Sequence, residues 1–396
     1  MSALLRVLVI HNAYQHRGGE DSVVADEIAL LRARGHAVET YARSNDEIAG
    51  MSRLALAGQT LWSRRTTRDL AGAIGHFRPD VIHVHNTFPL VSPSLYWGAE
   101  RAGVPVVQTL HNFRLLCPQA MLLREGRVCE DCLGRLPWRG VLRACYRDSV
   151  AQSAALTGML SLHRALGTWQ HKVARYIALN EFCRRKFIEG GLPGERIAVK
   201  PNFVDLPAPE DRPRGGALFV GRLSSEKGIR VLADAAEQVP ELDISVIGRG
   251  PEEGLLQGLP SVRCHGFRDA HGVRIAMAQA AFLVMPSIWY ENFPRTLVEA
   301  FAAGLPVVAS RLGALADLVR DGETGLLFEP GDAADLAAKL RWAAVHPAET
   351  ARMGRMARAE YEANYTADLN YQQLLTIYDG AIETRAAYPT CSKGPG

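Results

Sequence analysis

The sequence predicts an α/β protein made of two doubly wound domains, each a parallel sheet with helices on both faces. Short apolar runs recur along the 396 residues, and longer segments with helical spacing separate them. Such alternation is typical of parallel strands that are buried on both faces. The chain contains eleven such runs, which is more than one open sheet commonly holds, so two sheets are expected.

The apolar runs fall into two sets. The strands expected in the first half are 6–10, 37–42, 81–84, 104–110, 176–179 and 197–200. Those expected in the second half are 217–220, 244–247, 262–264, 282–285 and 307–309. Between the sets, NFVDLPAPEDRPRGG concentrates proline, glycine and charge, which is typical of a linker. We expect a first domain over 1–200, a linker over 201–216, a second domain over 217–375, and a helix end with a frayed tail over 376–396.

Composition excludes several classes of protein. Hydrophobic residues make up 47% of the chain and charged residues 22%, which argues against a disordered chain. The net charge of +3 is too small to indicate a nucleic-acid partner. The longest stretch without a charged residue, Val81 to Ala99, contains two histidines and two prolines and does not resemble a membrane span. The start, MSALLRVLVIH, lacks the features of a signal peptide, so a soluble, cytoplasmic protein is expected.

Polar residues follow the expected strands at the edge where doubly wound sheets bind ligands. In the first half these are His11-Asn12, leading to Gly18-Gly19, then His85-Asn86 and His111-Asn112. In the second half they are Gly221-Arg222, Gly248-Arg249-Gly250, His265-Gly266 and Pro286-Ser287. If the two sets face each other, they form a deep interdomain cleft, which would suit an enzyme with a two-part substrate.

The segment FVGRLSSEKGIRVLADAA predicts an anion site. A strand ends at Gly221, and an amphipathic helix is expected to begin near Gly228, with Arg222 and Lys227 beside its start. The free N–H groups and positive dipole of a helix start attract anions, and two cations there would suit a diphosphate. The alternative is an ordinary helix start with two solvated basic residues.

The segment PSIWYENFPRTLVEAFAAGLPVVAS predicts hydrogen-bond acceptors near a second helix start. Glu291 precedes Pro294, which is favoured at a first helical position, and Glu299 lies farther inside the helix. Either carboxylate can accept hydrogen bonds from sugar or ribose hydroxyls. The alternative is a plain amphipathic helix whose acidic residues only favour its N-terminus.

Together these motifs resemble the nucleotide-binding half of family-4 glycosyltransferases, which have the GT-B fold. The first half adds GGED at 18–21, DVIHVHN at 80–86 and the strand-end His111, and the second half adds VIGRGPE at 246–252 and DGETGLLFEP at 321–330. The resemblance covers nearly the whole chain in the family's order. It implies two Rossmann-like domains, the first on the acceptor side and the second binding the nucleotide sugar.

The resemblance also implies a role for each matching position in the second domain. Arg222 and Lys227 would hold the donor's diphosphate and stabilise it as it leaves. Glu299 would bind the ribose, and Glu291 would position the donor sugar hydroxyls. The remaining donor-binding positions implied there are the backbone around Asn292, Phe293 and Pro294 and the strand-end glycines Gly221, Gly250 and Gly266.

In the first domain, Gly18 and Gly19 resemble the loop that lets the backbone approach the phosphates and the acceptor. His111 is similar to the family's strand-end histidine beside the donor sugar and is expected to act in catalysis. Many relatives have Asp after this histidine, whereas this chain has Asn112, so the role of that carboxylate is vacant or moved.

The resemblance implies a retaining hexosyltransferase. Its donor would be a nucleotide diphosphate sugar, with UDP-sugars favoured and GDP-mannose an alternative. Its acceptor would be a saccharide or lipid-linked saccharide, in cell-surface polysaccharide or glycoconjugate synthesis. No Asp-x-Asp triplet occurs in the sequence, so no catalytic cofactor is expected and the two cations would replace a metal. The alternatives are a nucleotide-sugar epimerase of the same fold and a catalytically inactive, zinc-stabilised carbohydrate-binding protein.

Four cysteines follow His111 in a spacing that suggests a metal site. Cys117, Cys129, Cys132 and Cys145 include a Cys-x2-Cys pair, which in a cytosolic chain fits four-thiolate zinc better than disulfides. Such a zinc ion would be structural, bracing the acceptor-side loop. The alternative is a set of buried, inert thiols.

The segment 135–186 suggests attachment to the inner face of a membrane. It holds ten Lys or Arg residues and two acids, and it interleaves them with Trp138, Leu142, Met159, Leu162, Leu166 and Trp169. The last four have helical spacing and could form one face of a basic amphipathic helix on an anionic membrane. The alternative is that these residues face the domain core.

Overall fold

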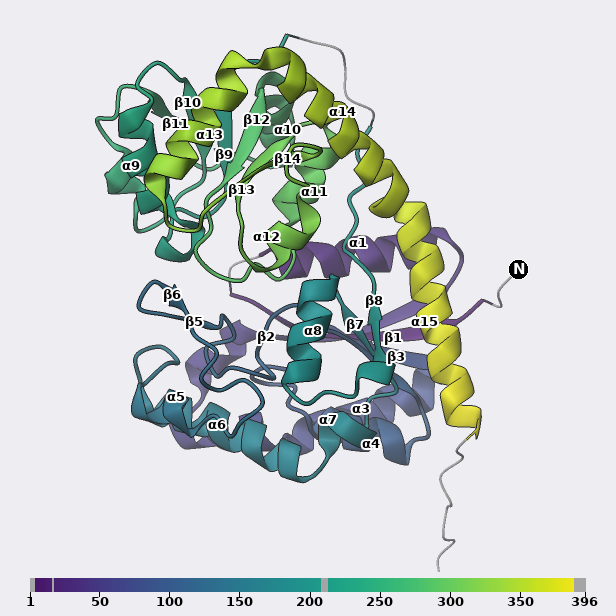
Figure 1. Cartoon of the computed structure of the whole chain (residues 1–396). Helices are drawn as coiled ribbons and strands as arrows, with labels where there is room; N and C mark the ends of the chain where they lie inside the picture. Colours follow the sequence, from purple (N-terminus) through teal and green to yellow (C-terminus); the bar gives the residue numbers. More distant parts are fainter. Residues whose placement is uncertain (1–3, 16–17, 208–212, 388–396) are drawn as a thin grey trace, which may run out of the picture. The chain divides into compact units, whose positions relative to one another are not determined.

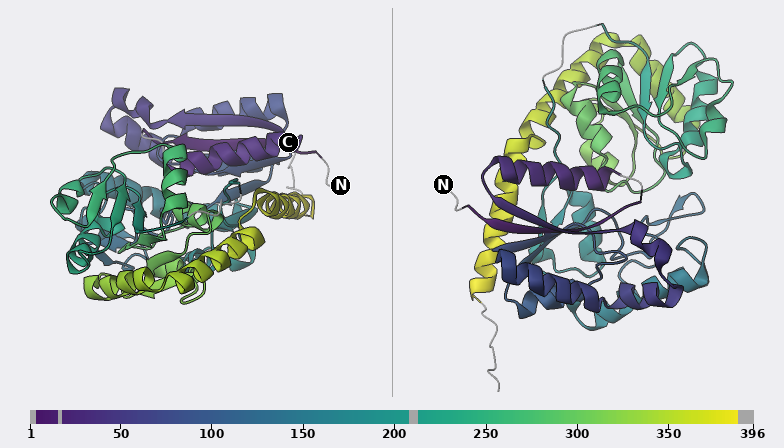
Figure 2. Two further views of the ribbon diagram at one scale, coloured as in Figure 1. Left: turned by 90° about the horizontal axis from the view of Figure 1, so that it is seen from above. Right: turned by 180° about the vertical axis from the view of Figure 1, so that it is seen from behind.

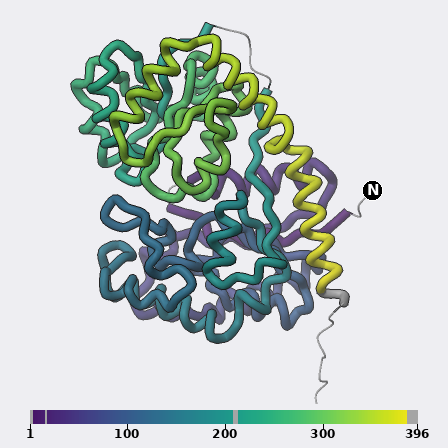
Figure 3. The backbone as a smooth tube through the Cα atoms, in the orientation of Figure 1, coloured from purple at the N-terminus to yellow at the C-terminus, as the bar shows by residue number. Residues whose placement is uncertain are grey.

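The computed structural model describes residues 4–15, 18–207 and 213–387, which form two compact units (Figure 1). Within these residues, the first unit comprises 4–121, 130–201 and 370–387, and the second comprises 122–129 and 202–369. Figure 3 follows the same course as a tube coloured along the sequence. Part of the expected linker, 208–212, and the end of the expected tail, 388–396, lie outside the described residues.

The first unit is a parallel sheet of six strands in the order β2-β1-β3-β4-β7-β8. Its strands are β1 (Arg6–Ala13), β2 (Ala37–Ser44), β3 (Val81–Val84), β4 (Val106–Thr109), β7 (Arg175–Ala178) and β8 (Ile197–Val199). Its helices are α1 (Gly19–Ala33), α2 (Arg53–Leu61), α3 (Arg64–Phe77), α4 (Ser94–Arg101), α5 (Trp138–Leu142), α6 (Val150–Ala165), α7 (Thr168–His171) and α8 (Glu181–Glu189). Short 3-10 turns occupy η1 (Asn45–Gly50) and η2 (Gly194–Arg196).

The second unit is also a parallel sheet of six strands, in the order β11-β10-β9-β12-β13-β14. Its strands are β9 (Ala217–Val220), β10 (Ile244–Ile247), β11 (Val262–Cys264), β12 (Phe282–Met285), β13 (Val307–Ser310) and β14 (Gly325–Phe328). Its helices are α9 (Ile229–Gln238), α10 (Ala270–Gln279), α11 (Arg295–Ala302), α12 (Gly313–Leu318), α13 (Ala333–Val345) and α14 (Pro347–Asn364), with 3-10 turns η3 (Ser225–Lys227) and η4 (Glu253–Leu256).

Apolar strands covered on both faces confirm the predicted fold class. All four residues of β3, β4, β12 and β13 are buried, and helices flank both faces of each sheet (Figure 2). Each strand interior can therefore be apolar without alternation, which is the pattern that the sequence shows. In the part of the chain that the structure describes, no helix combines the length and apolar character needed to cross a membrane.

Two strand features were not expected from the sequence. β14 lies within DGETGLLFEP, where glycine, proline and acidic residues lie on both sides of its four residues. A small antiparallel hairpin pairs β5 (Leu123–Arg124) with β6 (Arg127–Val128) around Glu125-Gly126. Turn residues on both sides of the β14 run obscure it, and strands of two residues are too short for a sequence pattern to identify them.

The C-terminal helix corrects the expected domain boundaries. The structure has one helix, α15 (Ala367–Ala387), which runs through the expected second-domain end at 375 and includes the helix end expected after it. From Asn370 onward this helix belongs to the first unit. Leu374, Tyr378 and Ala381 are fully buried in a cluster with Val7 and Val9 of β1. Burial of this apolar face provides the free energy that orders the helix.

Candidate active site

The carboxyl edge of the second sheet collects the predicted donor residues. Gly221 and Arg222 follow β9, Gly250 lies three residues after β10, Gly266 lies two residues after β11, and Ser287 lies two residues after β12. Because β11, β10, β9 and β12 are neighbours in the sheet, these chain ends meet at one edge. The order of strands reverses between β9 and β12, which is where doubly wound sheets bind ligands.

Lys227 and Glu291 form an ion pair that joins the two predicted motif segments. Lys227 Nζ donates to Glu291 Oε1 at 2.6 Å, and Ser287 Oγ donates to the same oxygen at 2.7 Å. The Glu291 side chain is 5% exposed and that of Lys227 is 25% exposed. A buried carboxylate requires such partners, because leaving it unpaired costs several kcal/mol, about 3–5. The pair therefore holds the Lys227 ammonium at a fixed place on this edge.

Gly228 lets this segment pass close to the end of β12. It takes φ +71°, and a Cβ there would lie 1.8 Å from the carbonyl oxygen of Pro286. A glycine is required on both counts, since any larger side chain would push the loop away from the strand. As expected, a helix begins directly after it, because α9 starts at Ile229 with Gly228 as its N-cap.

Arg222 and Glu299 have different surroundings on this edge. Arg222 is exposed after β9, so its guanidinium can reach an anion. Glu299 accepts from Arg295 Nε at 2.9 Å within α11, which is the i,i+4 pairing that a plain helix surface would also show. Proline is at the N-cap position of α11 rather than its first helical residue, since the helix begins at Arg295.

The residues before α11 are buried within the second unit. Asn292 and Phe293 are each 8% exposed, and the Phe293 ring lies 6.0 Å from that of Tyr365. Trp289 was missed by the sequence reasoning: Lys227 Nζ lies 5.5 Å from its ring centroid. Its indole nitrogen is buried with no hydrogen-bond partner among the described residues. Its position two residues before Glu291 is the signal that could have identified it.

In the first unit, the strand-end histidines lie together. His85 Nδ1 lies 2.9 Å from His111 Nε2, and their rings stack with centroids 5.2 Å apart. His11 lies edge-on to His85, with ring centroids 6.5 Å apart. The backbone of Asn12 donates to Asn86 at 3.0 Å, which joins the ends of β1 and β3 where the strand order reverses. The polar residues at or just after the ends of β1, β3 and β4 therefore lie together at one edge of the first sheet.

The Gly18-Gly19 loop leads directly into α1. Gly18 is the N-cap, and its amide donates to Asp21 Oδ2 at 2.8 Å. Asp21 also lies 2.8 Å from His11 Nε2 through its other oxygen, which ties the helix start to the end of β1. Both glycines are exposed, which leaves their backbone accessible to a ligand.

Glu20 is a protonatable carboxyl beside this loop. Tyr14 Oη donates to Glu20 Oε2 at 3.1 Å. Burial raises the pKa of Glu20 to about 8, which outweighs the hydrogen bonds from Tyr14 and Asn112 that would lower it. A carboxyl group therefore lies next to Asn112, the position at which many relatives are expected to have Asp.

A buried group of ionisable side chains lies beneath the histidines. Glu27 of α1 has Oε2 3.1 Å from Lys200 Nζ and Oε1 2.9 Å from His83 Nδ1. Sequence reasoning missed Glu27, although it occupies the buried stripe of α1 with Val23, Val24 and Leu31. A Glu at an apolar stripe position is the signal that could have identified it.

Burial and neighbouring charges shift the pKa values of this group strongly. Burial alone would raise the pKa of Glu27, but Lys200 and His83 hold it well below its usual range. Burial lowers the pKa of His85 to about 4, and burial together with His85 places the pKa of His111 well below its usual range. At neutral pH, Glu27 is thus a carboxylate, and the His85 and His111 rings are neutral.

The structure describes all four cysteines of the predicted zinc site as thiols. Cys117 and Cys132 are buried, and Cys129 and Cys145 are half-buried. Among the residues that the structure describes, no three of these thiols lie close enough together to hold one metal ion. The zinc site therefore stays a prediction from the sequence.

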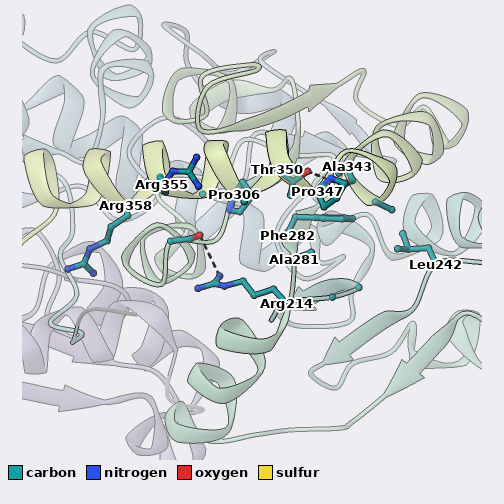
Figure 4. Close-up of a pocket in the computed structure, with 16 residues that line it drawn as sticks. Arg214, Leu242, Ala281, Phe282, Pro306, Ala343, Pro347, Thr350, Arg355 and Arg358 are labelled. Atoms are coloured by element: carbon teal, nitrogen blue, oxygen red, sulfur yellow. Dashed lines mark hydrogen bonds between the residues drawn. The ribbon is translucent and has the colours of Figure 1, made fainter. Parts of the chain in front are cut away.

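The second unit also has a cavity of about 690 Å³ (Figure 4). Gly216, Phe282 and Pro306 line it at the amino ends of their strands. Two of its arginines already have structural partners at the end of α11. Arg358 donates to the carbonyl of Ala302, and Arg214 donates to that of Ala303. We therefore assign this cavity no ligand.

Comparison with known families decides the relationship of the chain. The sequence model of the family described as glycosyltransferase family 4 matches residues 17–207. The family model described as glycosyl transferases group 1 matches residues 214–344. Phosphatidyl-myo-inositol mannosyltransferase of Mycobacterium leprae is 30% identical over 81% of this chain and 82% of its own length. The chain belongs to glycosyltransferase family 4.

Other relatives of this family-4 chain act on different substrates, according to their names. The sulfoquinovosyl transferase of Arabidopsis thaliana is 37% identical over 73% of the chain, which spans 54% of that relative. A glycogen synthase of Mycobacterium tuberculosis is 33% identical over 76% of the chain and 67% of its own length.

Solved structures show that this chain has the GT-B fold. Anabaena HepE, solved with UDP and glucose, matches at a TM-score of 0.67 and 19% identity over 95% of this chain and 99% of its own. Sucrose-phosphate synthase of Thermosynechococcus elongatus matches at a TM-score of 0.72 and 18% identity over 97% and 100%.

Proposed function

We propose that this family-4 chain is a retaining hexosyltransferase that uses a nucleotide diphosphate sugar. UDP-sugars are the favoured donors, since HepE was solved with UDP and with UDP-glucose. GDP-mannose is the alternative, since mannosyltransferases are among the relatives. The acceptor would be a saccharide or lipid-linked saccharide, in polysaccharide or glycoconjugate synthesis.

The ion pair between Lys227 and Glu291 is the observation that carries this proposal. It brings the segment expected to bind the diphosphate and the segment expected to bind the sugar within 2.6 Å of each other. Cleavage of a sugar–phosphate bond places negative charge on the leaving diphosphate. Fixed cations aimed at that charge lower the barrier, by about 3–4 kcal/mol for one well-placed donor group. Lys227 is fixed by its pair, and Arg222 is accessible for a bidentate contact.

The buried Glu291 would serve both the protein and the donor. Its Oε1 already accepts from Lys227 and Ser287. A carboxylate has further acceptor sites on its two oxygens, and these can accept hydrogen bonds from hydroxyl groups of the donor sugar. We propose that Glu299 similarly accepts from the ribose, and that no catalytic metal is needed because Arg222 and Lys227 supply the positive charge.

A patch of exposed apolar and basic residues supports a lipid-linked acceptor. Leu136, Trp138, Leu142 and Val150 are 60%, 55%, 73% and 57% exposed, around α5 and the start of α6. We name these four residues, with the exposed Arg135, Arg143 and Arg147 beside them, the α5–α6 patch. Exposed apolar side chains with arginines near them in the sequence suit the interface of an anionic membrane. We propose peripheral attachment there.

The prediction that the apolar residues between 159 and 169 form one face of an amphipathic helix on a membrane is wrong in part. Met159 and Trp169 are 3% and 2% exposed, so they pack in the core, whereas Leu162 and Leu166 are partly exposed. Helices of a doubly wound fold need an apolar face towards the domain interior, and Met159 of α6 and Trp169 of α7 belong to that face. The exposed apolar area lies instead around Trp138 and Leu142.

A thermal-shift screen of nucleoside diphosphates and their sugars tests the proposed donor. A ligand at 100 times its dissociation constant adds about 2.7 kcal/mol to stability, which is readily measured. We expect UDP or GDP, together with the matching sugar nucleotide, to raise the melting temperature. The alternatives separate in the next step, since an epimerase would convert the sugar of the bound donor and an inactive binding protein would leave it intact.

A further inference from the structure

The orientation of Glu27 determines which groups its two oxygens can serve. Oε2 lies 3.1 Å from Lys200 Nζ, and Lys200 also donates to Asn370 Oδ1 at 3.1 Å. Oε1 lies on the other side, 2.9 Å from His83 Nδ1 and 3.4 Å from His85 Nε2. Glu27 lies on α1, and His83 and His85 lie on β3 and just after it. Lys200 and Asn370 are 1% and 2% exposed, so this group is buried. One oxygen therefore faces an ammonium and the other faces two imidazoles.

The contact with Glu27 fixes the position of the proton on His85. Glu27 Oε1 and His85 Nε2 are both buried without a hydrogen-bond partner among the described residues. An ionised carboxylate can only accept, and a neutral imidazole carries one proton. If Nε2 were bare, two lone pairs would face each other in a buried site, which costs about 1–3 kcal/mol for an unsatisfied group. The proton of His85 is therefore on Nε2, and Nδ1 is bare.

The contact between the rings passes this choice to His111. His85 Nδ1 and His111 Nε2 lie 2.9 Å apart, so one must donate and the other accept. Because His85 Nδ1 is bare, His111 Nε2 carries the proton. The remaining nitrogen, His111 Nδ1, is left as an acceptor, and it has no hydrogen-bond partner among the described residues.

We propose that Glu27 is a positioning residue that sets the tautomers of His85 and His111 and leaves His111 Nδ1 ready to accept a hydrogen bond. For the identity of the accepted group the proposal rests on the proposed function, under which a hydroxyl of the sugar substrate would donate to His111 Nδ1. The tautomers themselves follow from Glu27 alone. Strand-end histidines held neutral and oriented in this way can bind a hydroxyl without carrying charge.

The substitution Glu27→Gln provides a specific test because it should invert both tautomers. The amide oxygen must face Lys200, which can only donate, so the NH2 group must face His83 and His85. His85 Nε2 then accepts, its proton moves to Nδ1, and His111 Nε2 becomes bare. His111 would present a donor in place of an acceptor at the same shape and volume.

The experiment is 15N NMR of histidine side chains, with only the 12 histidines labelled. Protonated and bare ring nitrogens have well-separated shifts, and His85→Gln and His111→Gln assign the two residues. The wild-type protein should show both rings protonated on Nε2, and Glu27→Gln should show both protonated on Nδ1. Asn370→Ala is the control, because it removes a partner of Lys200 but leaves the atom facing His85 unchanged.

Activity provides the second readout. Glu27→Gln should lower kcat/KM about tenfold, the size of one lost hydrogen bond, while Asn370→Ala should change it little. A wild-type spectrum with His111 protonated on Nδ1 would overturn the proposal even if the variant does not fold, and so would a Glu27→Gln spectrum with unchanged tautomers. If the tautomers invert but no nucleotide sugar binds, the proposed function fails and the role of Glu27 stands.

Discussion

At the scale of single residues, the two proposed phosphate-binding cations differ in what else they do. Arg222 is exposed, and no ion pair or hydrogen bond of its side chain is seen among the described residues, whereas Lys227 neutralises a buried carboxylate. The sequence motif predicts the same ligand for both. Substitution should therefore separate a residue that serves the ligand alone from one that also serves the fold.

We expect Arg222→Ala to lower turnover about 100-fold, with the unfolding free energy changed by less than about 0.5 kcal/mol. Lys227→Ala should lower turnover as strongly and should also destabilise the protein, because Glu291 loses its buried partner. Steady-state kinetics and chemical denaturation of both variants measure this. Wild-type turnover in both, beside an active parent, would contradict the assignment.

His85 should make stability depend on pH. Its folded pKa is lowered from 6.5 to about 4 by burial, so its contribution is fully present above pH 6.5 and is lost as the pH falls towards 4. The shift corresponds to about 3 kcal/mol. Urea denaturation at pH 7 and at pH 4.5 should therefore show a larger loss of stability in the wild type than in His85→Gln. Equal losses would mean that His85 is charged or solvated in the folded protein.

At the scale of elements, strands could be predicted wherever an apolar run was not crowded by turn residues. Runs such as Val81–Val84 and Phe282–Met285 match the structure at both ends because both faces of each strand are buried. β14 was missed because glycine and charged turn residues surround its four residues. The return of α15 to the first unit was missed because no local pattern reports a contact between Tyr378 and His83, 295 positions apart.

The candidate site shows the same limit. Arg222, Lys227, Glu291 and the histidines could be named from motifs, because motifs record residue types at strand ends. Their partners could not be named. Glu291 pairs with Lys227, and Glu27 faces Lys200 and two histidines. Both arrangements depend on side-chain directions that only the folded chain defines.

The loop with the cysteines carries a separate prediction. If Cys117, Cys129, Cys132 and Cys145 bind zinc, the purified protein should retain about one equivalent after gentle dialysis. Cys132→Ser should lose it, while Cys183→Ser, at a buried cysteine outside the set, should keep it. Elemental analysis after zinc-replete expression measures the content. No metal in the wild type would leave four ordinary thiols. Because the zinc is assigned no chemical role, short exposure to EDTA should leave activity intact.

At the scale of the whole molecule, the small net charge hides a local excess of cations around the α5–α6 patch. We expect the protein to float with anionic liposomes at low salt and to dissociate at high salt, because screening weakens surface electrostatics. The double variant Trp138→Ser, Leu142→Ser should reduce binding. Phe267→Ser, which removes another exposed aromatic residue far along the chain, should not. Equal binding to neutral and anionic liposomes would favour a soluble acceptor.

The central claim, that the chain transfers a sugar from a nucleotide diphosphate donor with retention, is tested most directly by time-resolved NMR of the reaction. Wild-type protein and Arg222→Ala are each incubated with UDP- and GDP-sugars and a saccharide acceptor, and the anomeric signals of the first-formed product are followed. We predict that the product keeps the anomeric configuration of the donor and forms about 100-fold more slowly in Arg222→Ala. A product with the inverted configuration, or one formed equally fast by the variant, would contradict the account.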